Sequence, residues 1–359
     1  MKWKFYSLAF VAGMSILTAC SSDDNNDNDG NGGNGNGNEI ENGTILKGTI
    51  TSDVTLAAGN TYKLSGEYIV EEGATLHIEE GVKIIAVYDD IADYILVKQG
   101  GKINAVGTPD KPIVMTSEKE EPGAWGGIHI CGRAHTNAEG GKGSSEIGGA
   151  VYGGNDDADN SGTLQYIRLE YTGFAFDEEH EANGISFYGV GNGTIVDHCQ
   201  AYKGSDDGFE FFGGSVNVSN LVAVSCSDDS FDWTEGWNGK GTNLVAYQED
   251  KSTLGYDCDC LMECDNNGSN NAATPVAHPV LKNLILVGNG GSKQGIRLRA
   301  GTEVEIDNAK VCGKGQPLTV ETALTENALK NGTSKLTNIT LTSELSSKEG
   351  IYTHADFIA

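Results

Sequence analysis

The sequence has few basic residues and few prolines for its length. Its 359 residues include 24 Lys and Arg against 51 Asp and Glu, which gives a formal net charge of −27, and only 6 are Pro. A chain this acidic, with no basic patch, is not expected to bind the phosphates of nucleic acids or anionic lipid headgroups. We therefore expect partners that are cations, neutral molecules or basic molecules.

Several motifs of well-known enzymes are missing as well. The seven His residues show no H-x3-H spacing, and the chain has no Gly-x-Ser-x-Gly elbow and no phosphate-binding loop. Zinc protease, serine hydrolase and nucleotide-binding activities therefore lack support. Cys258, Cys260 and Cys264 form a C-x-C-x3-C cluster, but the paired C-x2-C spacing and the fourth ligand of a zinc site are absent. Buried core thiols, or one local disulfide, explain this cluster better than a metal.

No apolar run reaches the roughly 20 residues that a membrane-spanning helix needs. The run from Phe5 to Leu17 follows two lysines and precedes Leu17-Thr18-Ala19-Cys20, which is the pattern of a cleavable export signal. The last four residues resemble the bacterial lipobox, and this resemblance implies that Cys20 is acylated and becomes the mature N-terminus. We predict a lipoprotein signal peptide over residues 1–19 and a lipid anchor on a membrane. Seven cysteines then remain, an odd number, so at least one thiol should be free unless the chain pairs with another.

The segment after Cys20 has no apolar residue to bury. It begins Ser-Ser-Asp-Asp-Asn-Asn-Asp and continues as an Asn/Gly-rich stretch to about Asn38. This composition favours a flexible tether, and we assign residues 20–43 to the lipidated cysteine and the tether. The acidic start resembles the surface-export signal of Bacteroidetes lipoproteins, which implies a surface-exposed location on the outer membrane. A plain spacer is the alternative.

From Thr44 onward, short strand-like runs alternate with turn residues, which indicates an all-β domain. One or two helical turns are expected only near Thr322 to Lys330. The run Ser205-Asp206-Asp207-Gly208-Phe209-Glu210-Phe211 returns 22 residues later as Ser227-Asp228-Asp229-Ser230-Phe231-Asp232-Trp233. A period near 22 residues, with about three strands and no helix, fits one coil of a parallel β-helix. We predict a single right-handed parallel β-helix over residues 44–359, and we expect it to be a monomer.

The flanks of this repeat carry a recurring asparagine, at Asn220, Asn243, Asn283 and Asn338. We expect these side chains to stack as an internal amide ladder at a turn. The spacing grows to 40 residues between Asn243 and Asn283. An insertion over about residues 265–279 should therefore loop out of the coil, and such insertions often mark a working face.

Four segments carry a resemblance to known proteins: Gly107-Thr108-Pro109-Asp110-Lys111-Pro112-Ile113, Trp125-Gly126-Gly127-Ile128, Tyr152-Gly153-Gly154-Asn155-Asp156-Asp157, and the run from Asp206 to Gly214. They resemble a group of Bacteroidetes surface proteins with right-handed β-helices. More distantly, the Asp-Asp-Gly-Phe-Glu run resembles coils of calcium-dependent pectate lyases. In such lyases the metal acidifies the proton next to a uronate carboxylate and a Lys or Arg removes it. The resemblance thus makes Arg297, Arg299 and Lys240 candidate bases.

Alternation within the repeated strand assigns its two faces. The side chains expected in the core are Phe209, Phe211, Phe231, Trp233, Ile185, Phe187, Ile296 and Leu298. The side chains expected in one outward row are Ser186, Glu210, Asp232, one of Asp257 or Asp259, and Arg297. The pairs Asp206/Asp207 and Asp228/Asp229 should stack beside that row.

Carboxylates that lie directly opposite on adjacent strands destabilise a sheet by a few tenths to about 1 kcal/mol each, so this row needs an explanation. One is a calcium ion held by Asp206, Asp207, Asp228, Asp229, Glu210 and Asp232. A second is catalysis, with Glu210, Asp232 and Arg297 as weak candidates and one carboxyl of raised pKa. A third is that the aspartates only cap backbone N–H groups and stay solvated.

Three aromatic side chains, Tyr188, Phe212 and Trp237, are expected outside the coil, where they could stack on sugar rings. Our hypothesis is a surface lipoprotein that engages glycans or another extracellular ligand through its acidic face, aided by calcium. The first alternative is a polysaccharide lyase or glycoside hydrolase. The second is a structural or adhesive protein with no ligand at the acidic row.

Overall fold

The computed structural model describes residues 38–89, 91–176 and 180–359. The predicted signal peptide, Cys20 and most of the predicted tether lie outside these residues. The described residues belong to one compact unit. No helix among them is long and apolar enough to cross a membrane.

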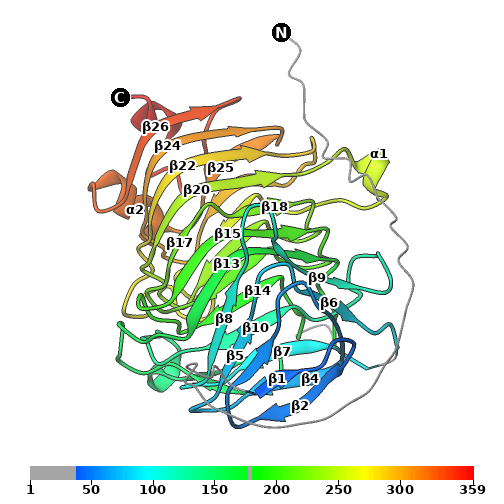
Figure 1. Cartoon of the computed structure of the whole chain (residues 1–359). Coiled ribbons are helices and arrows are strands. Elements are labelled where there is room, and N and C mark those ends of the chain that lie inside the picture. The colour runs from blue at the N-terminus through cyan, green and yellow to red at the C-terminus, as the bar shows by residue number, and fades with distance from the viewer. Residues whose placement is uncertain (1–37, 90, 177–179) are drawn as a thin grey trace, which may run out of the picture. The chain divides into compact units, whose positions relative to one another are not determined.

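The unit is built almost entirely from short strands, and 25 of them join one continuous sheet (Figure 1). The strands of this sheet are β1 (Asn38–Ile40), β2 (Ile45–Ile50), β3 (Val54–Leu56), β4 (Thr61–Val70), β5 (Thr75–Ile78), β6 (Lys83–Ala86), β7 (Tyr94–Val97), β8 (Lys102–Val106), β9 (Ile113–Ser117), β10 (Ile128–Cys131), β13 (Gly162–Glu170), β14 (Ile185–Tyr188), β15 (Ile195–Tyr202), β16 (Phe209–Phe212), β17 (Asn217–Ser219), β18 (Val222–Val224), β19 (Phe231–Thr234), β20 (Lys240–Tyr247), β21 (Met262–Cys264), β22 (Val280–Val287), β23 (Gln294–Leu298), β24 (Glu305–Cys312), β25 (Gln316–Val320), β26 (Lys335–Leu341) and β27 (Ser346–Ser347).

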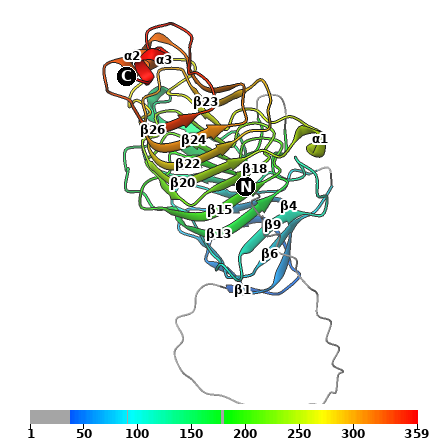
Figure 2. The same cartoon turned by 90° about the horizontal axis from the view of Figure 1, so that it is seen from above.

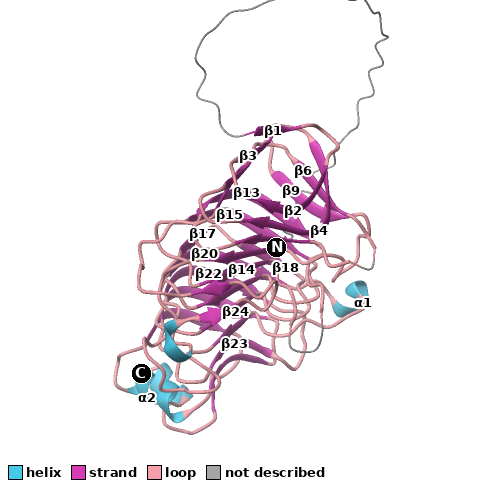
Figure 3. Ribbon diagram, turned by 90° about the horizontal axis from the view of Figure 1, so that it is seen from below, coloured by secondary structure: helices cyan, strands magenta, loops and turns pink. Residues whose placement is uncertain are grey.

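The remaining elements are small and lie between these strands. They are a hairpin of β11 (Gly143–Ser144) and β12 (Val151–Tyr152), a 3-10 turn η1 (Glu139–Gly141), and the helices α1 (Lys251–Leu254), α2 (Ala323–Lys330) and α3 (His354–Phe357). The helices lie at the margin of the strands (Figure 3). The helical turns expected near Thr322 to Lys330 are confirmed by α2.

Every strand pair of the large sheet is parallel, and the pairs follow one another in three stacks. Figure 2 shows part of one stack, in which β13, β15, β18, β20, β22, β24 and β26 succeed each other. A second stack runs through β7, β10, β14, β16, β19, β21, β23 and β25. A long strand can contribute to two stacks, since the first half of β13 pairs with β8 and its second half pairs with β9. Parallel strands that are stacked coil upon coil in this way form a single parallel β-helix. The predicted fold is thereby confirmed.

The core follows the alternation expected from the repeated strand. Phe209 pairs with Phe231, and Phe211 pairs with Trp233, in one register between β16 and β19. All eight side chains predicted to point inward are buried in one cluster. Their rings stack along the coil axis, with centroids 5.6 Å apart for Phe209 and Phe231 and 5.0 Å apart for Phe187 and Phe211. Each such pair adds about 0.5–1.5 kcal/mol beyond its burial.

The asparagine ladder exists, but it lies on the outside of the coil. Asn243 donates to Asn220 Oδ1 at 2.9 Å, and Asn283 donates to Asn243 Oδ1 at 3.0 Å. Asn308 extends the ladder, and Asn338 ends it by donating to Asp307. These asparagines adopt positive φ at a corner of the coil, between 54° and 62°. Asn tolerates this conformation because its short amide bonds locally, and here the side chain points to solvent. The expectation of an internal ladder was therefore wrong.

The extra residues of the long repeat are divided between two loops. One is residues 248–261, which include α1, and the other is residues 265–279, the segment predicted to loop out. The sheet also begins earlier than expected. Strand β1 starts at Asn38, inside the segment assigned to the tether, because Asn38, Glu39 and Ile40 pair with β3.

Candidate functional site

The outward row on the second stack matches the prediction at every position but one. The register places Ser186, Glu210 and Asp232 opposite one another. The next position is held by Glu263, followed by Arg297. Asp257 and Asp259, predicted for this position, lie before β21, because the loop that contains α1 shifts the chain. They instead pair with Lys251 and Lys293, respectively.

Carboxylates from several coils and two loops line a small pocket of about 170 Å³ on this face. Its lining residues are Glu146, Glu181, Asn183, Asp206, Asp207, Glu210, Asp228 and Asp232. We call this the acidic pocket. Glu146 comes from the β11–β12 hairpin and Glu181 from the segment before β14. Sequence reasoning missed both, because neither lies in a repeated segment.

The acidic pocket holds its carboxyl groups in an environment that disfavours charge. Burial and the nearby charge of Asp228 raise the pKa of Asp206 to about 8. Burial likewise raises the pKa of Glu146 to about 7 and that of Asp228, at the pocket mouth, to about 6. For Asp207, Glu210 and Asp232, burial together with neighbouring carboxylates raises the pKa well above its usual value. Such groups hold either protons or a bound cation near neutral pH.

Two of the aspartates also tie the coils together. The Asp229 N–H donates to Asp207 Oδ1 at 2.8 Å, and the Cys260 N–H donates to Asp229 Oδ1 at 2.6 Å. The same position in the preceding coil is Asn183, whose Oδ1 accepts from the Asp207 N–H at 3.2 Å. The backbone-capping explanation is therefore confirmed for one oxygen of each of these two aspartates. Both are buried, however, and not solvated as expected.

Glu210 is held by a chain of buried polar groups. Asn183 donates through Nδ2 to Glu210 Oε2 at 2.5 Å and to Ser186 Oγ at 3.1 Å. Ser186 Oγ lies 3.2 Å from His129 Nδ1, and His129 Nε2 lies 2.6 Å from the Gly126 carbonyl. Burial lowers the pKa of His129 to about 4, so the ring is neutral, donates to Gly126 and accepts from Ser186. One oxygen of Glu210 is thus fixed by the protein.

Within the described structure, the pocket carboxylates lack direct Lys or Arg partners, although the charges of Lys293 and Arg299 act on Asp228 and Asp232, respectively, from a distance. Among the described residues, none of them forms an ion pair with Lys or Arg, and Asp232 Oδ1 is buried without a hydrogen-bond partner. The ligand oxygens of Asp206, Asp207 and Asp228 lie within 4.8 Å of one another, and so do those of Asp207, Glu210 and Asp232. Several hard oxygen donors around one point suit Ca²⁺, which takes six to eight oxygens. The residues present therefore fit such an ion.

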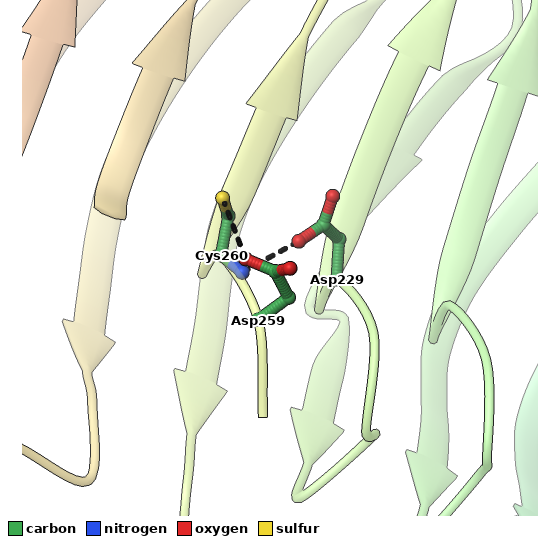
Figure 4. A group of neighbouring side chains, drawn as sticks. All are labelled: Asp229, Asp259 and Cys260. Carbon is green, nitrogen blue, oxygen red and sulfur yellow. Dashed lines mark hydrogen bonds between the residues drawn. The ribbon is translucent and has the colours of Figure 1, made fainter. Parts of the chain in front are cut away.

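A neighbouring group combines Asp229 and Asp259 with the thiol of Cys260 (Figure 4). Cys260 Sγ lies 3.4 Å from Asp259 Oδ1, and burial raises the pKa of this thiol well above its usual value. The thiol therefore stays protonated and donates a hydrogen bond. All seven described cysteines are free, and Cys258, Cys260 and Cys264 are buried. The cluster consists of buried core thiols, and the alternative of a local disulfide does not hold.

Beyond Asp232 the outward row changes character, because arginines neutralise it. Arg297 pairs with Glu263 at 2.8 Å and with Glu321 at 3.2 Å. Arg299 pairs with Glu263 at 2.5 Å and with Asp265 at 2.7 Å. Burial acts to lower the pKa of Arg297, but hydrogen bonds and charges from Glu321 and Glu263 outweigh it and raise the pKa, so the side chain stays protonated and cannot accept a proton. Lys240 lies on a different stack, beside Asn217 and Ser219, and not in the acidic pocket.

The three aromatic side chains expected outside the coil are all buried. Trp237 belongs to the core, where its ring stacks on Phe211 at 4.2 Å. Tyr188 and Phe212 do point out of the coil and stack on each other at 4.4 Å. The β11–β12 hairpin covers them through Ile147 and Tyr152. The expectation of exposed rings was wrong, since a covering hairpin leaves no trace in the repeat pattern.

Comparison with known proteins supports the architecture. A family model for pectate-lyase-like β-helix domains matches residues 48–358. Among curated proteins, none matches the chain. A domain of this kind fits a role connected with polysaccharides. By the extent of the match and by its three stacks of parallel strands, the chain belongs to the family of pectate-lyase-like β-helix domains.

Proposed function

We propose that the chain binds Ca²⁺ in its acidic pocket and, through the metal, holds an acidic polysaccharide outside the cell. The observation that carries this proposal is the convergence of carboxylates, several of them buried, that form no ion pair with Lys or Arg in the described part of the chain. Lipid on Cys20 would anchor the domain at the outer membrane surface, where calcium is abundant. Both the anchor and the location belong to the proposal.

A bridging metal would also overcome the electrostatic repulsion between this acidic protein and an acidic polysaccharide. The formal net charge of −27 repels a polyanion, so direct binding of uronate chains to the acidic face is unfavourable. A Ca²⁺ ion coordinated by pocket carboxylates on one side can take sugar carboxylate and hydroxyl oxygens on the other, because its coordination shell is large and flexible. The metal would thus convert an acidic surface into a site for acidic sugars.

Binding is favoured over cleavage because the candidate bases are engaged elsewhere. Arg297 and Arg299 each pair with two carboxylates, and Lys240 lies on another stack. A lyase needs an unprotonated base close to the metal, so that it can take the proton next to the sugar carboxylate. Polysaccharide cleavage therefore remains the second hypothesis, and a purely structural role the third.

The test uses the full chain and a panel of uronate-containing polysaccharides, with Ca²⁺ or with a chelator. We expect binding by calorimetry or affinity electrophoresis only in Ca²⁺. Asp228→Asn should abolish it, whereas Asp307→Asn, which changes a surface carboxylate beside Lys282 on a different stack, should not. Equal binding in chelator would contradict the metal bridge. Absorbance of unsaturated product would establish a lyase, and no binding to any polysaccharide would favour the structural role.

A further inference from the structure

We propose that Lys314 and Asn289 form an intramolecular isopeptide bond that joins two neighbouring coils of the β-helix. The two residues lie in turns outside the acidic pocket, and this inference is independent of calcium and of any polysaccharide. Asn289 follows β22 and Lys314 follows β24. These turns are already adjacent, because the Gly288 N–H donates to Cys312 O at 2.8 Å and the Gly290 N–H to Gly313 O at 2.6 Å.

Lys314 is an unusually buried amine. Only 4% of the residue is exposed, although lysine normally keeps its ammonium group in water. Its Nζ lies 3.0 Å from the Cys258 carbonyl oxygen and 3.4 Å from Asn289 Oδ1. Both of these partners are neutral oxygens. Burial lowers the pKa of Lys314, so a larger fraction of this amine is uncharged, and therefore nucleophilic, than would be the case at the surface.

Three reactive groups converge on the space next to Gly291. A Cβ atom placed on this glycine would lie 3.3 Å from Asp257 Oδ1, 3.5 Å from Asn289 Oδ1 and 3.7 Å from Lys314 Nζ. An amine, an amide and a carboxylate therefore face one point, and the glycine leaves that point open. Because the reacting groups are already held together, the reaction is intramolecular, and this proximity lowers its activation barrier.

The reaction balances without any oxidant or cofactor. The lone pair of Lys314 Nζ attacks the amide carbon of Asn289 and forms the new C–N bond. Asp257 takes a proton from the attacking nitrogen, directly or through one water, and returns it to Nδ2. The bond between the amide carbon and Nδ2 then breaks, and Nδ2 leaves as ammonia. The Lys251 ion pair lowers the pKa of Asp257, so Asp257 begins as the carboxylate that accepts the proton.

The leaving group, the side-chain nitrogen of Asn289, makes no interaction within the described part of the chain that stabilises the fold. Among the described residues, Asn289 Nδ2 is buried and has no hydrogen-bond partner. Its departure therefore removes an unsatisfied polar group and costs no existing interaction. The product would link the turn after β22 to the turn after β24 covalently, so these two coils could not separate.

The test is peptide mapping of the purified full chain after complete denaturation. We expect a branched peptide that joins Asn289 to Lys314, lighter by one ammonia than the two linear peptides together, and no cleavage by trypsin after Lys314. Asn289 precedes Gly290, and a succinimide at this Asn-Gly pair also loses one ammonia. That product is linear and needs no lysine, so Lys314→Met separates the two.

Four variants complete the test. Lys314→Met and Asn289→Ala should each lack the branched peptide and melt at a lower temperature than the parent. Lys310→Met changes an exposed lysine on β24, the strand that precedes Lys314, and should keep the branched peptide and the melting temperature of the parent. Asp257→Asn should slow the appearance of the branch in a time course after synthesis. Linear peptides with a free Lys314 in the parent chain would overturn the proposal, and so would a branch that survives in Lys314→Met.

Discussion

Asp232 and Glu263 are neighbours in one outward row, on adjacent strands of the same stack, yet their surroundings differ. Glu263 lies between two arginines and forms ion pairs with both. Asp232 faces the acidic pocket, where one of its oxygens has no partner within the described structure. Both halves of the row lie on parallel strands that continue the same register.

The comparison separates carboxylates that form ion pairs within the protein from carboxylates that remain free to bind an external ligand. Around Glu263, positive and negative side chains are interleaved, so the protein neutralises itself. Among the described residues, neither Asp232 nor Glu210 forms an ion pair with Lys or Arg, although the charge of Arg299 acts on Asp232 from a distance. Glu210 is held by a hydrogen bond from Asn183. A row of like charges that is kept without internal counter-ions is best explained by an external cation.

The largest effect is expected from Arg297→Met, which extends the unpaired carboxylates into the neutralised half. Glu263 is largely buried and would lose one of its two arginines, so we expect the free energy of unfolding to fall by about 3 kcal/mol. Urea denaturation in chelator measures it. Glu263→Gln in the same chain should recover part of the loss. A change below about 0.5 kcal/mol would show that the ion pairs do not compensate this half of the row.

The second effect is stabilisation of the parent chain by Ca²⁺. A ligand that binds only the folded state at one hundred times its Kd adds about 2.7 kcal/mol to the free energy of unfolding. We expect a matching rise in Tm, and no rise for Asp206→Asn combined with Asp228→Asn. Arg297→Met should gain at least as much from Ca²⁺ as the parent. If the double variant gains equally, the metal does not bind at the pocket.

The third effect concerns pH in the absence of metal. The pKa of Asp206 is raised from 3.8 to about 8, and that of Asp228 to about 6. Groups with a raised pKa in the folded state stabilise it below their unfolded pKa, near 4, and this contribution is lost as the pH rises toward 8. We therefore expect Tm in chelator to fall between about pH 4 and 8. Calcium should oppose this fall, because it replaces the protons. A Tm that rises over this range would contradict the raised pKa values.

The smallest effect is expected from Asp206→Asn alone. In chelator at about pH 9, above the raised pKa of Asp206, the removal of one negative charge beside Asp228 should raise the free energy of unfolding by a few tenths to about 1 kcal/mol. In Ca²⁺ the same variant should be less stable than the parent, because it lacks a ligand oxygen. Asp307→Asn, whose carboxylate pairs with Lys282, should show no such reversal of sign. The same sign in both conditions would mean that Asp206 does not contact the metal.

The sequence predicted the coil because each repeat of about 22 residues corresponds to one coil of the β-helix. The inward positions of Phe209, Phe231 and their equivalents follow from strict alternation, and the stacking of Glu210 on Asp232 follows from the 22-residue spacing. Glu263 could not be aligned, because inserted residues precede it and shift the count. Glu146 and Glu181 could not be found at all, since they reach the pocket from loops. Trp237 shows the same limit, because only the folded coil reveals that Phe211 covers its ring.

Calorimetric titration of the full chain with Ca²⁺ tests the central claim most directly. The account predicts saturable binding by the parent that weakens as the pH falls through the raised pKa values, and loss of binding in Asp206→Asn combined with Asp228→Asn. Asp265→Asn, from the half of the row that arginine neutralises, should bind as the parent does. No heat of binding in the parent, or equal affinity in the double variant, would contradict the account.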